Sequence, residues 1–260
     1  MSDEPILLTS LDQGVATLTL NRPAARNPLS TAMMTEIETA LARAAEDRET
    51  RVVVLAANGP AFCAGHDLKE MRALEGRDAI AKVFAQCSRM MTAIVRHPKP
   101  IIAKVHALAT AAGCQLVASS DLAFAAEGAR FATPGVNIGL FCSTPMVALS
   151  RAVPRKRAMQ MLLTGELVDA PTAAAWGLVN QVVPAADLDR VVDETARLIA
   201  SKSPYTLKVG KQAFYAQIEM PLEDAYAHAS QVMTENMLAF DAAEGIDAFL
   251  SKRVPCWRGE

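Results

Sequence analysis

Polar and apolar positions alternate over Val15–Leu20, which predicts a half-buried β-strand. The pattern then changes to helical spacing. Ser30 is a suitable N-cap, and Met33, Ile37 and Leu41 follow on one face. We therefore expect a strand followed by an amphipathic helix in the first fifth of the chain.

Further along, continuous apolar runs predict buried strands, and an apolar stripe of helical period through Ile80–Ile94 predicts a core helix. A further helix is expected at about Lys156–Leu163, with Gly165 as its C-terminal stop. Strands alternate with helices, which favours an α/β fold. The expected buried strands are Arg51–Ala57, Ile101–Leu108, Asp121–Ala125 and Leu178–Val183.

The last part of the chain has a different pattern, because no strand is predicted after about Pro184. A helix is expected from Pro221, and Asp241–Glu244 resembles the capping-box start of a final helix. We predict a core of residues 1–200 and a helical C-terminal region of residues 201–260. The apolar face of this region suits oligomerisation, and packing against the chain's own core is the equal alternative.

Composition and charge exclude several classes of protein. The chain has 260 residues, 51% of them hydrophobic, and a net charge of -2, so no global basic field recruits nucleic acid. The single basic cluster, Arg151–Arg157, is interpreted as a solvated helix start. The longest uncharged stretch, Phe131–Ser150, is interrupted by prolines and glycines, which favours buried turns over a membrane span.

Five scattered cysteines without a C-x-x-C pair favour reduced thiols over a disulfide framework or a zinc site, so no metal is expected. The chain starts with the acidic segment M-S-D-E-P, which lacks the basic region of a signal peptide. These two features together predict a cytoplasmic location.

Two segments carry the candidate chemistry: Ala61–Leu68 (A-F-C-A-G-H-D-L) and Leu108–Leu116 (L-A-T-A-A-G-C-Q-L). Each follows a β-rich apolar stretch and leads into a turn or helix start. Together they can present two backbone N–H groups to one oxygen, which suits a reaction through an enolate or another oxyanion. Ala112 lies at a strand-to-helix junction, where free N–H groups and the helix dipole favour an anion.

Six segments in a fixed order can be compared with known families: L-N-R-P-A-A-R-N-P-L-S (Leu20–Ser30), F-C-A-G-H-D-L-K-E-M (Phe62–Met71), H-P-K-P-I-I-A-K-V (His97–Val105), A-A-G-C-Q-L (Ala111–Leu116), F-A-T-P-G-V-N-I-G-L (Phe131–Leu140) and E-G-I-D-A-F-L-S-K-R-V-P-C-W (Glu244–Trp257). Through these segments the chain resembles the crotonase (enoyl-CoA hydratase/isomerase) family over nearly its full length, and the segment Gly139–Pro145 resembles a narrower branch of it. The resemblance implies a spiral of ββα turns, a helical C-terminal trimerisation region and trimers that can pair into hexamers. It also implies an acyl-CoA or enoyl-CoA ligand, a place in fatty acid metabolism, and no cofactor besides the CoA of the substrate.

The resemblance also assigns residues to the expected site. The thioester oxygen would accept hydrogen bonds from the N–H groups of His66 and Ala112. The His66 imidazole is either a catalyst or a side chain that points away from the thioester. Alanine at 112 stands where the family usually has glycine, which matters only if the position requires a positive φ. The path of the CoA nucleotide and pantetheine would be lined by Ala24, Arg26, Ala64, His66, Asp67 and Leu68.

The two glutamates that hydrate a double bond in crotonases fall on Gln115 and Gly135. A glutamine does not transfer protons at neutral pH and a glycine has no side chain. One positioned acid or base is worth typically ~10²–10⁴ in rate, so the loss of both should cost at least ~10⁴. Ser143 stands where a related isomerase has an aspartate, and Asp67 is expected to brace the loop. Cys142 is expected to be a buried structural thiol rather than a nucleophile.

Three functions stay open on these residues. The family label is an enoyl-CoA hydratase-like lyase or isomerase, although efficient hydration is not expected. A non-catalytic acyl-CoA binder or hydrolase-like scaffold is the second. Another enolate reaction, such as isomerisation, decarboxylation or thioester hydrolysis, is the third. Replacing both Gln115 and Gly135 by glutamate is expected to raise the hydration of crotonyl-CoA.

Overall fold

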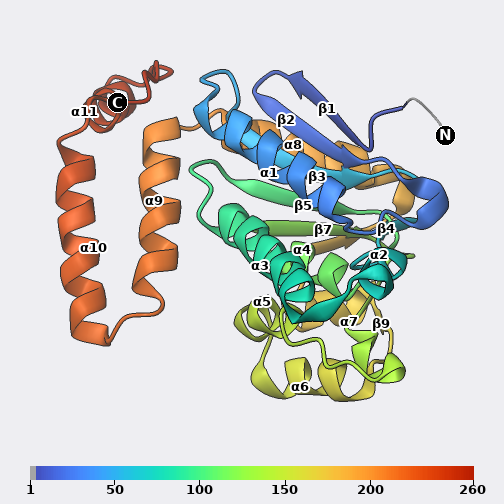
Figure 1. The fold of residues 1–260 in the computed structure, drawn as a ribbon. Helices are drawn as coiled ribbons and strands as arrows, with labels where there is room; N and C mark the ends of the chain where they lie inside the picture. Colours follow the sequence, from blue (N-terminus) through green and yellow to red (C-terminus); the bar gives the residue numbers. More distant parts are fainter. Residues whose placement is uncertain (1–3) are drawn as a thin grey trace.

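The computed structural model describes residues 4–260, so the first three residues of the acidic start lie outside the described residues. Two sheets form the core (Figure 1). The larger sheet is parallel except for its first strand, which pairs antiparallel with the second. Its strands, in spatial order, are β1 (Leu7–Asp12), β2 (Val15–Leu20), β3 (Val52–Ala57), β5 (Ile101–Val105), β7 (Leu122–Ala126) and β10 (Gln181–Val183).

The smaller sheet consists of short strands whose last member is antiparallel to its neighbour. From β3 to β8 the strands come in pairs, one in the larger sheet and the next in the smaller, and each pair is followed by a helix. This repeated step is a spiral of ββα turns, as the resemblance implied. The strands of the smaller sheet, in spatial order, are β4 (Ala61–Cys63), β6 (Leu108–Thr110), β8 (Arg130–Ala132) and β9 (Val168–Asp169).

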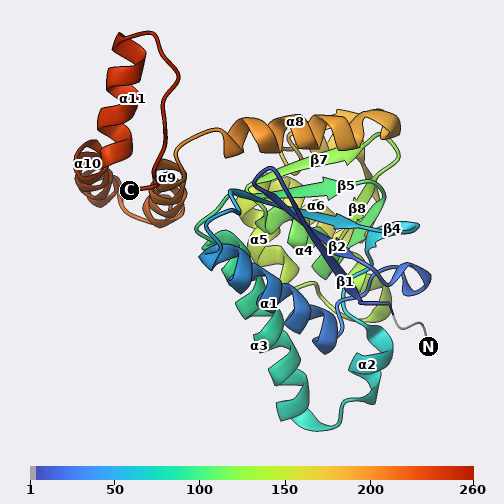
Figure 2. The same ribbon diagram turned by 90° about the horizontal axis from the view of Figure 1, so that it is seen from above.

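Helices cover both faces of the larger sheet. One face carries the main core, in which the buried stripe of the first helix packs with that of the third. The other face is covered by the eighth helix (Figure 2), whose Leu188, Val192 and Ala196 pack on Val52 and Phe124. The helices of the core are α1 (Thr31–Glu46), α2 (Leu68–Ala73), α3 (Gly76–Val95), α4 (Ala112–Ser119), α5 (Pro145–Ala152), α6 (Arg155–Thr164), α7 (Ala170–Ala175) and α8 (Leu188–Ala200), with 3-10 turns at η1 (Pro23–Ala25), η2 (Pro134–Ile138) and η3 (Ala185–Asp187).

The last three helices, α9 (Pro204–Gln217), α10 (Leu222–Met237) and α11 (Phe240–Leu250), form an arm beside the core (Figure 1). One buried cluster fastens the arm. Lys211 of α9 contacts Asp121 at 2.7 Å and also donates to the carbonyl oxygens of Ile94 and Lys99, while the Tyr215 hydroxyl donates to Asp121. The chain end folds back on α11, where buried Asp241 accepts from the N–H groups of Arg258 and Gly259.

Several predicted elements are confirmed. The strand Val15–Leu20 and the helix capped by Ser30 are present, and the Ser30 hydroxyl accepts from the Met33 N–H. The helix that Gly165 terminates spans Arg155–Thr164, and Gly165 is left-handed, with φ 63°.

Other predictions were wrong in part. The run Ile101–Leu108 forms two strands, because β5 ends at Val105 and the chain then enters the smaller sheet. Only Gln181–Val183 of the Leu178–Val183 run is a strand. The final helix begins at Phe240, so Asp241 lies in its first turn and bonds the chain end instead of capping the helix.

Surface placement also differs from expectation. The segment 137–141 of the expected buried turns is exposed, and Ile80 and Phe84 of the α3 stripe are 38% and 36% exposed. The basic cluster spans two helices, because Arg151 lies in α5 and Arg157 in α6. Arg151 pairs with Glu219, and Arg157 stacks on Trp176.

Candidate active site

The loop that contains Arg26 and Leu29 lies beside the loop that contains Ala64 and Gly65, although the two are far apart in sequence. The Ala64 N–H donates to the Arg26 carbonyl at 3.0 Å, and the Leu29 N–H donates to the Gly65 carbonyl at 2.7 Å. The expected CoA-lining positions therefore come together. Ala24, Arg26 and Leu68 are exposed, whereas Ala64 and Asp67 are partly buried.

Asn27, which sequence reasoning did not single out, holds this arrangement. It is fully buried and left-handed, with φ 51°. Its amide donates to the carbonyl oxygens of Asn58 and Ala61, both at 2.8 Å, and accepts from the Arg22 N–H at 2.7 Å. Asparagine tolerates this backbone region better than most residues, and the asparagine in the turn Asn21–Asn27 is the signal that could have marked it.

The two backbone N–H groups expected to form the oxyanion hole have no partner in the part of the chain that the structure describes. Within residues 4–260, neither the His66 N–H nor the Ala112 N–H has a hydrogen-bond partner. The two segments are in contact, since a Cβ atom at Gly65 would lie 3.4 Å from the Ala112 nitrogen and 2.9 Å from the Ala111 Cβ. Two free N–H groups on adjacent peptide segments can hold one oxyanion.

The residue with a positive φ is Ala111, one residue before Ala112. Ala111, the N-cap of α4, has φ 50° and ψ -118°, whereas Ala112 is not among the residues with positive φ. Position 112 therefore does not require a positive φ, and alanine fits there as glycine would. A non-glycine residue in this region costs of order 1–3 kcal/mol and is typical of functional sites.

The first turn of α4 packs directly on β4. A Cβ atom at Gly113 would lie 2.1 Å from the Cys63 carbonyl oxygen, so only glycine fits. This contact brings the Ala112 N–H close to the loop of His66.

Carboxylates near the loop are engaged in structure. Asp67 caps α2 by accepting from the N–H groups of Lys69 and Glu70, and it pairs with Arg22 at 3.2 Å. Glu70 accepts from the Thr31 N–H at 3.0 Å. These contacts fit the expectation that Asp67 braces the loop.

The His66 ring packs against α3. Its centroid lies 5.5 Å from that of Phe84, in an edge-on arrangement at 78°. Burial lowers the pKa of His66 below its usual 6.5, although nearby Glu70 opposes the shift. The Nε2 atom is buried and has no hydrogen-bond partner among the described residues.

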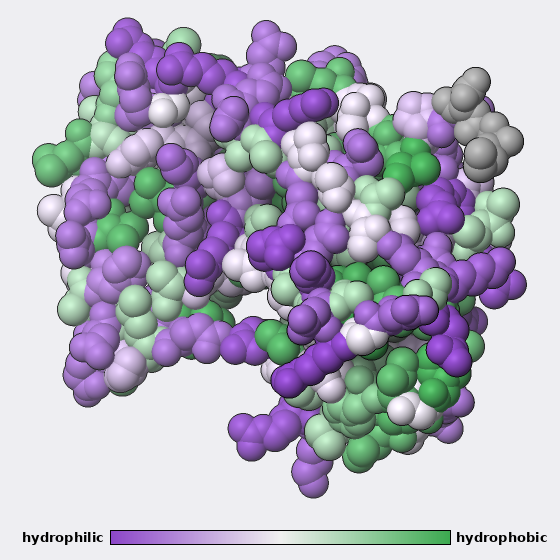
Figure 3. Space-filling view, viewed as in Figure 1, coloured by the Kyte–Doolittle hydropathy of each residue, from purple (hydrophilic) through white to green (hydrophobic). Residues whose placement is uncertain are grey.

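Gln115 lies one helical turn after Ala112 and is 4% exposed. Its Oε1 atom is 4.0 Å from the Cys87 thiol of α3. The residue also lines a cavity of ≈ 1050 Å³ between α3, α4, α5 and α9, whose wall includes Met91 and Val147. The hollow between the arm and the core is visible in Figure 3.

Gly135 has no room for a side chain. A Cβ atom there would lie 2.6 Å from the Leu140 carbonyl oxygen and 2.9 Å from the Cys142 sulfur. The loop is also bonded to Gly135, since the Leu140 N–H donates to its carbonyl at 2.9 Å. The structure therefore leaves no room for the second of the two glutamates that are expected to raise hydration.

The remaining polar candidates offer no free base. Cys142 is buried, accepts from the Gly135 N–H at 3.4 Å, and has its pKa raised by burial. The exposed Ser143 donates only to the Phe141 carbonyl at 3.4 Å, and Asn137 is exposed. All five cysteines are free. In the part of the chain that the structure describes, no group of three histidine, cysteine or acidic residues could hold a metal ion.

The sequence model described as enoyl-CoA hydratase/isomerase matches residues 10–260 of this chain. The chain belongs to the enoyl-CoA hydratase/isomerase family. It is 48% identical over 255 residues to enoyl-CoA hydratase domain-containing protein 3, mitochondrial, of Rattus norvegicus, which covers 98% of this chain and 85% of that protein.

Solved structures agree with the fold. The structure of an enoyl-CoA hydratase from Mycobacterium smegmatis has a TM-score of 0.95 and 54% identity, covering 98% of this chain and 99% of that one. Human enoyl-CoA hydratase domain-containing protein 3 has a TM-score of 0.95 and 47% identity, covering 97% and 100%. The crotonase fold and the narrower branch predicted from Gly139–Pro145 are both confirmed.

The predicted cytoplasmic location was wrong. The rat, mouse and human relatives are named as mitochondrial proteins. The prediction rested on reduced thiols and on the acidic start, and a reducing environment does not by itself distinguish one compartment from another. In a separate finding, no helix among the described residues is both long and apolar enough to cross a bilayer.

Proposed function

We propose that this protein binds acyl-CoA thioesters and stabilises their enolates, with the thioester oxygen between the N–H groups of His66 and Ala112. The observation that carries the proposal is the pair of free N–H groups on adjacent, braced segments. Both are backbone groups on fixed elements, so they need no reorganisation when negative charge develops on the oxygen.

The loops beside this pair suit the rest of the ligand. Arg26 is exposed at the rim, where its guanidinium can meet the CoA phosphates. Ala24, Ala64, Asp67 and Leu68 lie along the same strip. The ≈ 1050 Å³ cavity beside Gln115 offers room for the acyl chain.

The chemistry we propose is that of an enoyl-CoA hydratase-like lyase or isomerase with slow hydration. An oxyanion donor is worth ~10²–10³ in rate and does not replace two missing glutamates. A non-catalytic acyl-CoA binder is the second candidate, because Gln115 and Gly135 carry no proton-transferring group.

Titration calorimetry with two ligands tests the proposal. Butyryl-CoA should bind, and S-butyl-CoA, a thioether without the carbonyl oxygen, should bind about tenfold or more weakly. Each lost hydrogen bond is worth about 0.5–1.5 kcal/mol, and 1.4 kcal/mol is tenfold. Equal affinities would show that the carbonyl oxygen is not held, and no binding of either would end the acyl-CoA proposal.

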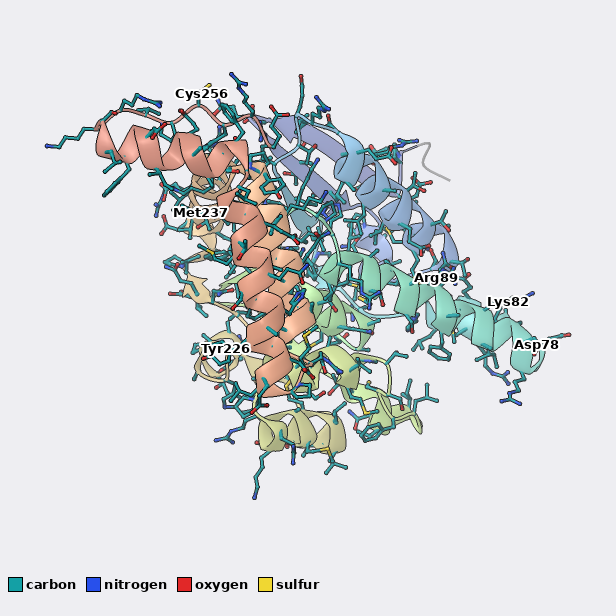
Figure 4. The ribbon with its side chains drawn as sticks, turned by 90° about the vertical axis from the view of Figure 1, so that its left-hand side faces the viewer. Asp78, Lys82, Arg89, Tyr226, Met237 and Cys256 are labelled. Atoms are coloured by element: carbon teal, nitrogen blue, oxygen red, sulfur yellow. The ribbon has the colours of Figure 1, made fainter. Side chains whose placement is uncertain are left out.

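We also propose self-association as a trimer or a dimer of trimers through the arm. The apolar residues Leu222, Tyr226 and Met233 of α10 are 67%, 69% and 66% exposed in the single chain. Figure 4 shows Tyr226 near one end of α10 and Met237 near the other, so the apolar surface extends along the helix. Light scattering at micromolar concentration should give three or six times 27.8 kDa, and a monomer would contradict the proposal.

A further inference from the structure

The imidazole of His66 packs on Phe84, but this contact leaves its Nε2 atom without a hydrogen bond to any described residue. The backbone of His66 forms half of the oxyanion hole, whereas its Nε2 atom is buried without a partner among residues 4–260. Leaving a buried polar atom unsatisfied costs about 1–3 kcal/mol. Such an atom in a native fold calls for an explanation, and a catalytic role is one of the usual ones.

The His66 ring and the Gln115 side chain both contact the same stretch of α3. The His66 ring contacts Phe84, and the Gln115 amide contacts Cys87, which is three residues further on. Residues three apart on a helix are neighbours on one face. Gln115 in turn stands one turn after Ala112, whose N–H completes the hole. An acyl group whose oxygen accepts from the His66 N–H lies next to the residue that carries the imidazole, and its α-carbon is bonded directly to the carbonyl carbon.

The other titratable groups around the hole are occupied or poorly suited. Asp67 is held by Arg22 and by the start of α2, and Glu70 is held by Thr31. Burial raises the pKa of Cys87 to about 11, so its thiol stays protonated at neutral pH. Burial also keeps the His66 ring neutral at pH 7, with Glu70 of α2 as the charged group that faces it.

We propose that the imidazole of His66 is the base that removes a proton from the α-carbon of the bound acyl-CoA. This rests on the proposed function. The Nε2 lone pair forms the new N–H bond, and the C–H electron pair becomes the enolate double bond. The thioester π pair moves to the oxygen, which the N–H groups of His66 and Ala112 hold. The imidazolium then returns a proton, or a deuteron after exchange with D₂O, so no further reactant is needed.

In this proposal the Phe84 side chain has to move before the α-carbon can reach Nε2. It packs edge-on against the imidazole and is 36% exposed at the surface of α3. It can turn away when an acyl chain enters, and this movement opens Nε2 to the α-carbon. Figure 4 shows α3 extending beyond the rest of the core toward Lys82 and Asp78, with Arg89 nearer the core.

Deuterium exchange at the α-carbon of butyryl-CoA in D₂O, followed by mass spectrometry, tests the proposal without knowledge of the natural reaction. The protein should exchange the α-protons. His66→Gln keeps the backbone N–H, so calorimetry should give an unchanged dissociation constant for butyryl-CoA while exchange slows at least ~100-fold. His106→Gln is the matched control, because His106 lies before β6, at the opposite end from Ala112, and bonds only the Gly59 carbonyl.

The pH profile provides a second measurement. A base acts in its neutral form, so exchange should be level above pH 6.5 and fall as the pH drops through the lowered His66 pKa. The proposal is overturned if butyryl-CoA binds but does not exchange, if His66→Gln exchanges at the original rate, or if exchange becomes faster as the pH drops below 6.5. Failure of butyryl-CoA to bind would instead overturn the proposed function.

Discussion

Gly135 offers a direct test of why this chain lacks the second hydratase glutamate. Replacing it with alanine adds one Cβ atom, which would lie 2.6 Å from the Leu140 carbonyl oxygen and 2.9 Å from the Cys142 sulfur. The obstacle on one side is backbone, and the Leu140 N–H is bonded to Gly135. The Cys142 sulfur is the end of a side chain and can turn aside, but the Leu140 carbonyl is backbone, so the loop must shift.

The expected magnitude follows from overpacking. Forcing an extra carbon into a filled site costs typically 1–3 kcal/mol, so Gly135→Ala should lower the free energy of unfolding by about that much. Gly128→Ala is the matched control. A Cβ atom there meets nothing within 4 Å, and Gly128 is not among the glycines with positive φ, so the change should stay within about 0.5 kcal/mol.

Urea unfolding at equal protein concentration measures both variants, because stability depends on concentration if the protein self-associates. The rate of crotonyl-CoA hydration then tests the effect of glutamates at 115 and 135 on activity. Gln115→Glu alone should raise the rate by up to ~10²-fold, since it restores one acid or base, although burial will raise the pKa of the new carboxyl. Adding Gly135→Glu should give no further gain. The reasoning is refuted if Gly135→Ala is as stable as Gly128→Ala and the double variant hydrates faster than the single one.

Three other changes have defined outcomes. Burial lowers the pKa of both His66 and His97, so the unfolded state binds more protons and stability should fall as the pH drops below 6.5; thermal melts between pH 7.5 and 5 that show no decline would contradict this. Lys211→Met removes the ammonium beside Asp121, which keeps its hydrogen bonds from the Tyr215 hydroxyl and the Ile101 N–H, and should cost about 1–3 kcal/mol in urea unfolding, whereas Lys208→Met on the exposed side of α9 should cost almost nothing. Ala111→Gly relieves a positive φ and should stabilise the fold by roughly 1 kcal/mol in the same assay, with butyryl-CoA affinity retained; a destabilised variant would show that Ala111 is not strained.

Much of the core could be predicted because its signals are local. The alternation over Val15–Leu20 and the Ser30 cap each depend on a few neighbouring residues, and both appear as expected. The apolar run Ile101–Leu108 failed for the opposite reason. Hydropathy does not reveal that the chain leaves one sheet after Val105 and joins another at Leu108.

The arm shows a second limit of sequence patterns. Leu222, Tyr226 and Met233 recur at helical spacing, and the helix they predict is present. Their apolar stripe does not say what covers it, and in the single chain it stays exposed. Asp241 misled in the same way, since its contacts are with Ser203, Arg258 and Gly259, which are distant in sequence.

Understanding the candidate site needs both the sequence and the structure. Gln115 and Gly135 could be recognised as changed positions from sequence, but sequence alone does not explain why a glycine stands at 135. The structure supplies the reason: the 140–142 loop occupies the space where a side chain would go, while Gln115 remains open to a cavity. The two losses are therefore not equivalent. One position retains room for a proton-transferring group and the other does not, so a glutamate can be added at 115 but not at 135 unless the 140–142 loop moves.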